Sequence, residues 1–149
     1  MSVSNRVEIE NALFRWARGF DEGDVEAFLS SVTEDAQLTV ETEDGAIVGP
    51  ICGHDALRAF VSDRIARRMN QQRHVTTNVI IKEHGDDEVS TTSYVTILQL
   101  SDGKHEIVAS GTYRDRLELT EGRWRIKDRH LLWTGVSTGS SPSEPPTTT

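Results

Sequence analysis

Apolar residues recur at helical spacing in three segments of the N-terminal half of the chain. The first segment covers 5–22 and ends before Gly23, a residue type that commonly terminates helices. Asp24 follows, and an aspartate in this place can cap a short second helix over 25–32. The third segment covers 54–70. The apolar positions expected to face inward are Val7, Leu13, Phe14, Ala17 and Phe20, then Phe28, Leu29 and Val32, and finally Leu57, Phe60, Val61, Ile65 and Met69.

From residue 71 onward apolar and polar residues alternate with a period of two, which is typical of strands. Short turns rich in Gly and Asp separate the runs, so an antiparallel arrangement is favoured. Including two shorter strands before the third helix, the expected strands cover 36–42, 46–49, 71–82, 89–100, 105–120 and 124–133.

Helices followed by such a sheet predict an α+β fold. Three helices should pack on one face of a curved, mainly antiparallel sheet, and the space between them should form a pocket. The side chains expected to be buried between the layers are Leu13, Ala17, Phe28, Leu57, Phe60 and Ile65.

One face of the strand expected over 71–81 carries polar residues before it carries apolar ones. Val75, Thr77, Val79 and Ile81 alternate there with His74, Thr76, Asn78 and Ile80. A polar face looks either at water or into a pocket that needs polar groups. Because Thr76 and Asn78 accompany His74, we interpret this face as the lining of a pocket, with Asn78 deeper.

Composition excludes several classes of partner. The 149 residues suffice for one domain, and 24 acidic against 16 basic side chains give a formal net charge of −8. Such a charge repels phosphate backbones, so no nucleic acid partner is expected. We also expect no membrane contact, because no apolar run approaches the roughly 20 residues that cross a bilayer. The single cysteine, Cys52, can form no internal disulfide, and the N-terminus lacks a secretion signal, so a cytoplasmic location is expected.

The last residues differ in composition from the rest of the chain. Residues 137–149 are rich in Ser, Thr and Pro and poor in apolar side chains. We expect a disordered tail there, following a single domain over 1–136.

Three segments in this order resemble the SnoaL-like branch of the nuclear transport factor two superfamily. Residues 17–40, "ARGFDEGDVEAFLSSVTEDAQLTV", are similar to the paired first helices of that family. Residues 71–81, "QQRHVTTNVII", are similar to its His-x-x-Thr-Asn strand, and residues 110–129, "SGTYRDRLELTEGRWRIKDR", to its closing hairpin. The resemblance implies a cone-shaped α+β fold with an open mouth, often dimerised through the outer sheet face.

Within that superfamily the polar residues resemble those of the scytalone dehydratase, bile-acid dehydratase and hexachlorocyclohexane dehydrochlorinase branch. Such enzymes pair an aspartate near the end of the first helix with a histidine on the strand after the third helix, and Asp21 and His74 occupy these places. Arg129 matches, in its spacing from Trp124, an arginine of the dehydrochlorinase. The resemblance therefore implies a lyase, acting on a hydrophobic small molecule, with these three catalytic residues.

The chemistry of these side chains suits elimination. A neutral imidazole can take a proton from carbon near pH 7, and a carboxylate on its other nitrogen fixes the tautomer. A guanidinium such as that of Arg129 could receive the leaving anion or an enolate oxygen. No metal or other cofactor is expected, because His54, His84, His105 and His130 are too scattered to suggest zinc ligands.

An apolar wall should surround the pair and suit a cyclic or aromatic substrate. We expect the pocket to be lined by Trp16, Phe20, Asn78, Tyr94, Leu131 and Trp133. Simple alternation places Ile126 and Asp128 on one strand face and Arg129 on the other, so Arg129 enters the pocket only if a bulge interrupts the strand. Asp115 is expected to pair with Arg114, Arg116 or Arg129.

Two other classes of function stay open. A ketosteroid-isomerase-like enzyme would move a proton without expelling a group, but it would prefer a tyrosine and a protonated acid as oxyanion donors. A non-catalytic binding protein, or a partner like the small subunit of ring-hydroxylating dioxygenases, would need no buried pair of Asp21 and His74. The distinguishing geometry is whether these two side chains are hydrogen bonded and face an enclosed cavity.

Overall fold

The computed structural model describes residues 1–136, in which helices and strands follow the expected order. The predicted tail, 137–149, lies outside the described residues, and the domain boundary at 136 stays a prediction. The helices are α1 (Val3–Glu22), α2 (Val25–Ser30) and α3 (Gly53–Arg67); the strands are β1 (Val32–Glu41), β2 (Ile47–Cys52), β3 (Gln71–Glu83), β4 (Glu88–Ser101), β5 (Lys104–Thr120) and β6 (Arg123–Val136).

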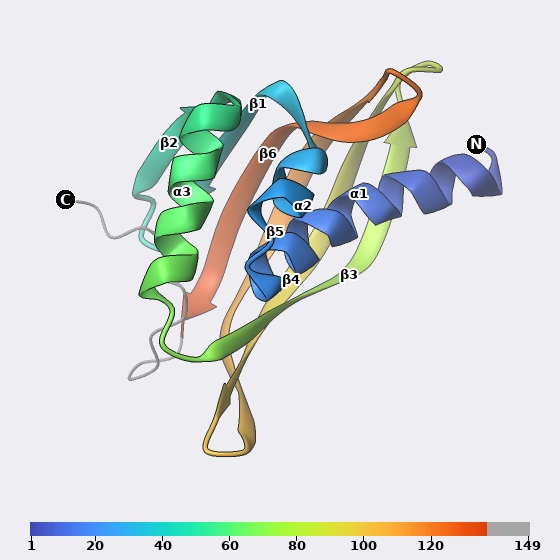
Figure 1. Cartoon of the computed structure of the whole chain (residues 1–149). Coiled ribbons are helices and arrows are strands. Elements are labelled where there is room, and N and C mark those ends of the chain that lie inside the picture. Colours follow the sequence, from blue (N-terminus) through green and yellow to red (C-terminus); the bar gives the residue numbers. More distant parts are fainter. Residues whose placement is uncertain (137–149) are drawn as a thin grey trace.

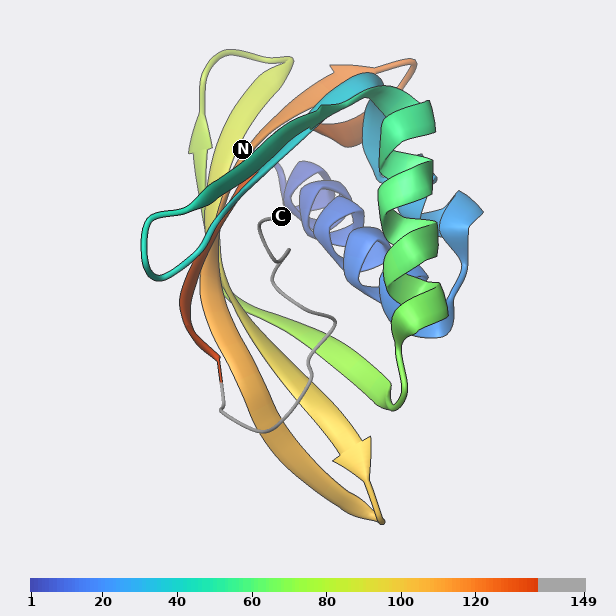
Figure 2. The ribbon, with the colours of Figure 1, turned by 90° about the vertical axis from the view of Figure 1, so that its left-hand side faces the viewer.

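One sheet contains all the strands of the described part of the chain, in the order β2-β1-β6-β5-β4-β3. The neighbours β1 and β6 run parallel, and every other pair is antiparallel. The helices lie on one side of this sheet (Figure 1), and the sheet curves around them (Figure 2). The expected α+β architecture is therefore confirmed.

Local signals in the sequence explain where α1 and α2 begin and end. The Ser2 hydroxyl accepts a hydrogen bond from the Asn5 N–H, and Gly23 ends α1 with a φ of 71°. Asp24 then caps α2 by accepting a hydrogen bond from the Ala27 N–H. The chain thus turns from α1 into α2 within two residues, which places Phe28 against the inner face of α1.

The expected core is found, with three exceptions at its edges. Leu13, Ala17, Phe28 and Leu57 are buried, and Phe60 and Ile65 are half-buried against the core. Val7 and Phe14 are exposed, because the buried stripe of α1 follows Ile9, Ala12, Leu13, Trp16 and Phe20 instead. Met69 is 91% exposed because α3 ends at Arg67, before its predicted last turn.

Two β-bulges decide which residues face the helices. In β3 the register shifts between Thr77 and Ile80, and Asn78 has a φ of 55°. In β6 the partners of Arg116 and Leu117 are Asp128 and Ile126, so Lys127 is the additional residue. After each bulge the alternation is inverted. Hence Val79 and Ile81 turn inward, and so do the residues Arg129, Leu131 and Trp133.

Among residues 1–136, we find no helix of the length and hydrophobicity that a membrane span requires.

Gly19 provides a test of the contact between α1 and α2. A Cβ atom at this position would lie 2.4 Å from the backbone nitrogen of Phe28 and 2.9 Å from the carbonyl oxygen of Asp24. Replacement of glycine by alanine usually stabilises a helix by about 1 kcal/mol. Here we expect Gly19→Ala to lower the free energy of unfolding by about 3 kcal/mol, because backbone atoms must move apart.

Chemical denaturation of the variant measures this effect. Asn11→Ala, at an exposed position of the same helix, is the matched control and should leave stability nearly unchanged. A Gly19→Ala variant as stable as the wild type would show that α1 and α2 are not packed as described.

Candidate active site

Asp21 and His74 are brought together although they lie 53 residues apart in the sequence. Asp21 lies on the last turn of α1, and its Oδ1 is 2.5 Å from the ring Nδ1 of His74 on β3. The same carboxylate accepts hydrogen bonds from the His74 backbone N–H, at 3.1 and 2.9 Å. The exposed fractions of the two side chains are only 14% and 7%. One largely buried carboxylate therefore fixes both the position and the rotation of the imidazole.

This contact determines how the imidazole can act. When the ring is neutral, its hydrogen lies on Nδ1, where Asp21 accepts it. Nε2 then carries a lone pair and points away from the carboxylate. A carboxylate at the C-terminal end of a helix is unfavourable by itself, and the hydrogen bonds from His74 explain why Asp21 is found there.

An aromatic contact also holds the imidazole. The Phe20 ring lies 4.7 Å from the His74 ring, centroid to centroid, and 6.3 Å from that of Phe28. Trp16 and Phe28 are 4.2 Å apart by the same measure. Arg68, just after α3, donates a hydrogen bond to the Phe20 carbonyl over 3.0 Å and so links α3 to the end of α1.

A small cavity adjoins His74 between the helices and the sheet. Its volume is about 40 Å³, more than the roughly 10–15 Å³ that a cavity needs to hold a water molecule. The described residues that line it are Trp16, Phe20, Leu38, Val40, Phe60, Arg64, His74, Tyr113, Leu131 and Trp133. Most of this wall is apolar and aromatic.

Four of the residues expected in the pocket line this cavity, and two lie elsewhere. Trp16, Phe20, Leu131 and Trp133 take part in the wall. Asn78 is exposed, because the bulge at its own position turns it to the solvent side. Tyr94 is 56% exposed on the outer face of the sheet, where it pairs with Thr77 and Thr112.

Arg129 is inside the molecule but outside the cavity wall as described. Its Nε and Nη2 donate to Asp115 over 2.7 and 2.8 Å, and both side chains are buried. Its guanidinium carbon is 3.6 Å from the centroid of the Tyr113 ring and 4.7 Å from that of Trp16. Both rings line the cavity, so Arg129 lies behind the wall. The expected direct contact of Arg129 with a leaving group is therefore not supported by this arrangement.

The opposite charges of Asp115 and Arg129 stabilise one another. Burial alone would lower the pKa of Arg129, but the charge and hydrogen bonds of Asp115 outweigh it and raise the pKa above its ordinary value. Asp115 also accepts a hydrogen bond from the Thr91 hydroxyl over 3.3 Å. Of the three arginines considered as its partner, Arg129 holds it inside the core, and the guanidinium stays charged beneath the aromatic wall.

Tyr113 is a cavity residue that the sequence pattern did not lead us to expect. It lines the cavity on β5 and is almost fully buried. Burial raises its pKa, an effect that the nearby Arg129 opposes, so the phenol is neutral near pH 7 and can donate a hydrogen bond. Its alternation with Asp115 was a usable signal: once Asp115 is assigned to a buried ion pair, Tyr113 must point inward too.

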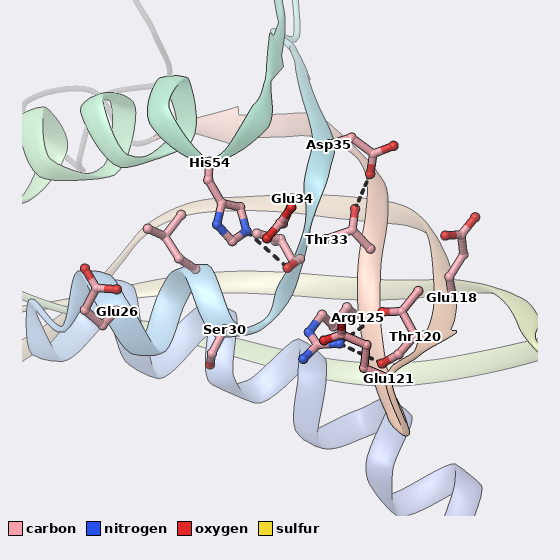
Figure 3. A pocket seen from close by; sticks show the side chains of 12 residues that line it. Glu26, Ser30, Thr33, Glu34, Asp35, His54, Glu118, Thr120, Glu121 and Arg125 are labelled. Atoms are coloured by element: carbon pink, nitrogen blue, oxygen red, sulfur yellow. Dashed lines mark hydrogen bonds between the residues drawn. The ribbon is translucent and has the colours of Figure 1, made fainter.

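A larger, open depression lies near α2 and the β5–β6 turn (Figure 3). It has a volume of about 610 Å³ and is lined by Glu26, Leu29, Ser30, Val32, Thr33, Glu34, Asp35, His54, Glu118, Thr120, Glu121 and Arg125. Many of its polar groups already serve the fold: Glu26 pairs with Arg58, Glu118 pairs with Lys127, and His54 donates to the Val32 carbonyl.

Within 1–136, no group of three or more His, Cys, Asp or Glu side chains is arranged to hold an ion. Compared with the open depression, the cavity beside His74 is the better candidate for the site, because it combines a fixed imidazole with an apolar wall.

The Asp115–Arg129 pair allows a prediction about stability. Asp115→Asn leaves the guanidinium buried without its counter-charge, and we expect the free energy of unfolding to fall by roughly 3–5 kcal/mol. The double variant, Asp115→Leu with Arg129→Met, should lose less free energy of unfolding, since no charge then remains buried.

Urea denaturation of both variants tests this expectation, with Asp128→Asn at an exposed position of β6 as the control. If the double variant were less stable than Asp115→Asn, the attraction between Asp115 and Arg129 would stabilise the fold by more than the burial of their charges costs, and this expectation would be wrong.

Comparison with known proteins gives the family. The model of the SnoaL-like domain matches residues 1–130. A search of curated proteins finds no match. Several solved structures share the fold, including a protein of unknown function from Mycobacterium tuberculosis, Rv3472. It is 28% identical, with a TM-score of 0.73 over 94% of this chain and 76% of that one.

Two structures from Novosphingobium aromaticivorans show the same fold at lower identity. One is a candidate aromatic ring hydroxylase, 24% identical, with a TM-score of 0.76 over 96% of this chain and 98% of that one. The other is a candidate scytalone dehydratase, 20% identical, with a TM-score of 0.73 over 91% and 87% of the two chains. With the family model covering nearly all of the described residues, this chain belongs to the SnoaL-like domain family.

Proposed function

We propose that this protein is a cofactor-independent lyase of the dehydratase or dehydrohalogenase type, acting on an apolar cyclic or aromatic substrate. The observation that carries the proposal is the 2.5 Å contact of Asp21 with His74 beside an apolar cavity. An imidazole held by a buried carboxylate suits a general base. A protein that only packs an apolar ligand would not need this pair.

The proposed reaction begins at Nε2 of His74. Its lone pair takes a proton from carbon, and the C–H electrons form a double bond to the neighbouring carbon. That carbon releases hydroxide or halide with the electrons of the broken bond. Asp21 stabilises the resulting imidazolium. In a dehydration the imidazolium proton passes to the departing hydroxide to give water, and in a dehydrohalogenation it passes to solvent.

Tyr113 supplies the second polar group that this reaction needs. Its neutral hydroxyl can donate to an oxygen of the substrate or to the leaving group as negative charge develops there. In the proposal Tyr113 therefore takes the role first considered for Arg129. Arg129 contributes indirectly, through Tyr113, because its guanidinium carbon lies 3.6 Å from the centroid of the phenol ring.

An isomerase would use the same base, His74. The presence of Tyr113 in the cavity wall favours that alternative, because an isomerase would prefer a tyrosine as an oxyanion donor. Such an enzyme would prefer a second, protonated acid as donor, however, and Asp115 is committed to Arg129. The lyase needs only one hydrogen-bond donor, and Tyr113 provides it in the cavity wall. The lyase therefore fits the site better.

Proton transfer can be tested before the natural substrate is known. Cyclic β-hydroxy and β-halo ketones, such as 3-hydroxycyclohexanone, should lose water or halide in the presence of the protein, and their α-protons should exchange with deuterated solvent. His74→Ala should lower both rates by about 10²–10⁴-fold. Asp21→Asn should lower them as much or less, because it disturbs the tautomer and the charge while leaving the base in place.

Proton NMR follows exchange and elimination in one sample. His105→Ala, on the exposed part of β5, is the matched histidine control and should retain full rates. Normal turnover by a folded His74→Ala variant would refute the lyase. Exchange without elimination would favour the isomerase, and binding without either would favour a non-catalytic binding protein.

The proposal also includes a homodimer in the cytoplasm. Val75, Ile80 and Tyr94 are exposed large side chains on the outer sheet face, and a second copy of the chain would cover them. Light scattering at tens of micromolar should give twice the chain mass of 16.6 kDa. Ile80→Glu should return the mass to that of a monomer, whereas Ile47→Glu, at a similarly exposed position on β2, should not. A monomeric wild type would exclude a stable dimer.

A further inference from the structure

Trp133 carries a buried hydrogen-bond donor that the fold does not use. Its side chain lines the cavity beside His74, and the residue is only 7% exposed. The indole Nε1 is shielded from solvent, and no group of the described residues accepts its hydrogen. A buried donor without an acceptor carries the full cost of losing its contact with water. The indole N–H of Trp133 is therefore a group that a ligand can stabilise.

Packing against the sheet holds this indole in place. Trp133 follows the bulge at Lys127 on β6, so its side chain faces the helices. Its cross-strand partner is Gly111 on β5, where a Cβ atom would lie 3.2 Å from Cε3 of the indole. The ring is thus packed closely over a residue without a side chain. A close-packed indole has little room to turn toward a different acceptor.

The other side chains of the wall do not supply the missing acceptor. None of the described residues that line the cavity has a carboxylate or amide side chain. The acceptors among their side chains are the Tyr113 oxygen and Nε2 of His74. The Tyr113 oxygen already accepts a hydrogen bond from Trp16, and its own hydrogen remains as a donor. The aromatic wall thus offers two donors, on Tyr113 and Trp133, beside the lone pair of His74.

We propose that the ligand of this cavity is a cyclic compound with a carbonyl oxygen, and that the indole N–H of Trp133 donates a hydrogen bond to this oxygen. A carbonyl oxygen accepts hydrogen bonds and donates none, which matches an N–H that lacks an acceptor. Phe20, Phe60 and Leu131 would contact the ring. This inference rests on the proposed function, because it takes the cavity beside His74 as the substrate site.

The carbonyl group would serve the proposed elimination directly. As Nε2 of His74 takes the proton from the neighbouring carbon, negative charge develops on the carbonyl oxygen. A donor already aimed at this oxygen lowers the barrier to proton transfer. Tyr113 then remains to donate to the departing hydroxide or halide. Trp133 and Tyr113 would therefore bind the two ends of the reacting unit, the carbonyl group and the leaving group.

Binding of cyclohexanone and methylenecyclohexane to the full chain provides the test. Both probes contain the same ring, but only the ketone has an acceptor. Neither carries a leaving group, so titrations at pH 7 measure binding without elimination. Nitrogen–proton NMR spectra resolve the indole N–H of each of the three tryptophans. We expect cyclohexanone to shift the Trp133 indole proton downfield, as a new hydrogen bond does, and methylenecyclohexane to cause no downfield shift.

Trp133→Phe separates the donor from the aromatic ring, because phenylalanine lacks the N–H. It should weaken cyclohexanone binding about fivefold, as is typical for the loss of one neutral hydrogen bond, and leave methylenecyclohexane binding nearly unchanged. Trp124→Phe is the matched control. Trp124 lies on the same strand, and its Nε1 is also buried without an acceptor among the described residues, but Trp124 does not line the cavity. This variant should keep both affinities.

Absence of the downfield shift at every cyclohexanone concentration up to saturation would overturn the proposal, and this measurement needs no variant. So would a folded Trp133→Phe variant that binds cyclohexanone as tightly as the wild type. Equal losses of affinity for both probes in that variant would show that Trp133 acts through its shape alone, which also contradicts the proposal.

The shift of the Trp133 resonance is independent of turnover. Normal turnover by His74→Ala would refute the lyase and leave the shift standing. Absence of the shift, with turnover still lost in His74→Ala, would refute only the role of Trp133. The two proposals therefore fail separately.

Discussion

The Asp21 carboxylate joins the end of α1 to the start of β3, and the geometry of the cavity follows from this contact. It accepts hydrogen bonds from both the backbone and the ring of His74. A single group thus sets the distance between helix and sheet as well as the direction of the imidazole. Gly23 then ends α1, and the immediate start of α2 brings Phe28 beneath Trp16 and Phe20. The end of α1 therefore supplies both the carboxylate that orients the base and two aromatic residues of the cavity wall, Trp16 and Phe20.

The helices and the general order of strands were predictable because their signals are local. Gly23 and Asp24 mark the junction of α1 and α2 in the sequence itself. The facing of side chains in the sheet was harder to predict, since it depends on bulges. Asn78 offered a partial signal, because asparagine tolerates a positive φ, whereas Lys127 offered none. Without the bulge at Lys127, Leu131 would have faced away from the helices.

Arg129 illustrates why a matching position need not carry a matching role. Its bulge turns it inward, but Asp115 holds it behind Tyr113 and Trp16. Two opposite charges are buried together there, an arrangement that is costly unless each is well hydrogen bonded. As a result, the positive charge of Arg129 is fixed beside the neutral phenol of Tyr113 in the cavity wall. Because a shared fold does not imply a shared chemistry, the function of this chain depends on such contacts and not on its family alone.

The cavity is small, so binding of a ring requires part of the site to move while the rest stays fixed. About 40 Å³ is much smaller than a cavity of roughly 150 Å³ that binds benzene, so a ring needs more space than the cavity now offers. Asp21, His74 and Tyr113 lie on α1, β3 and β5, whereas Phe60 and Arg64 lie on α3, of which only Leu57 and Val61 are buried. Elements with few buried contacts move at low cost. A ring could therefore enter by displacing the α3 side chains, and the hydrogen bond that orients the imidazole would remain in place.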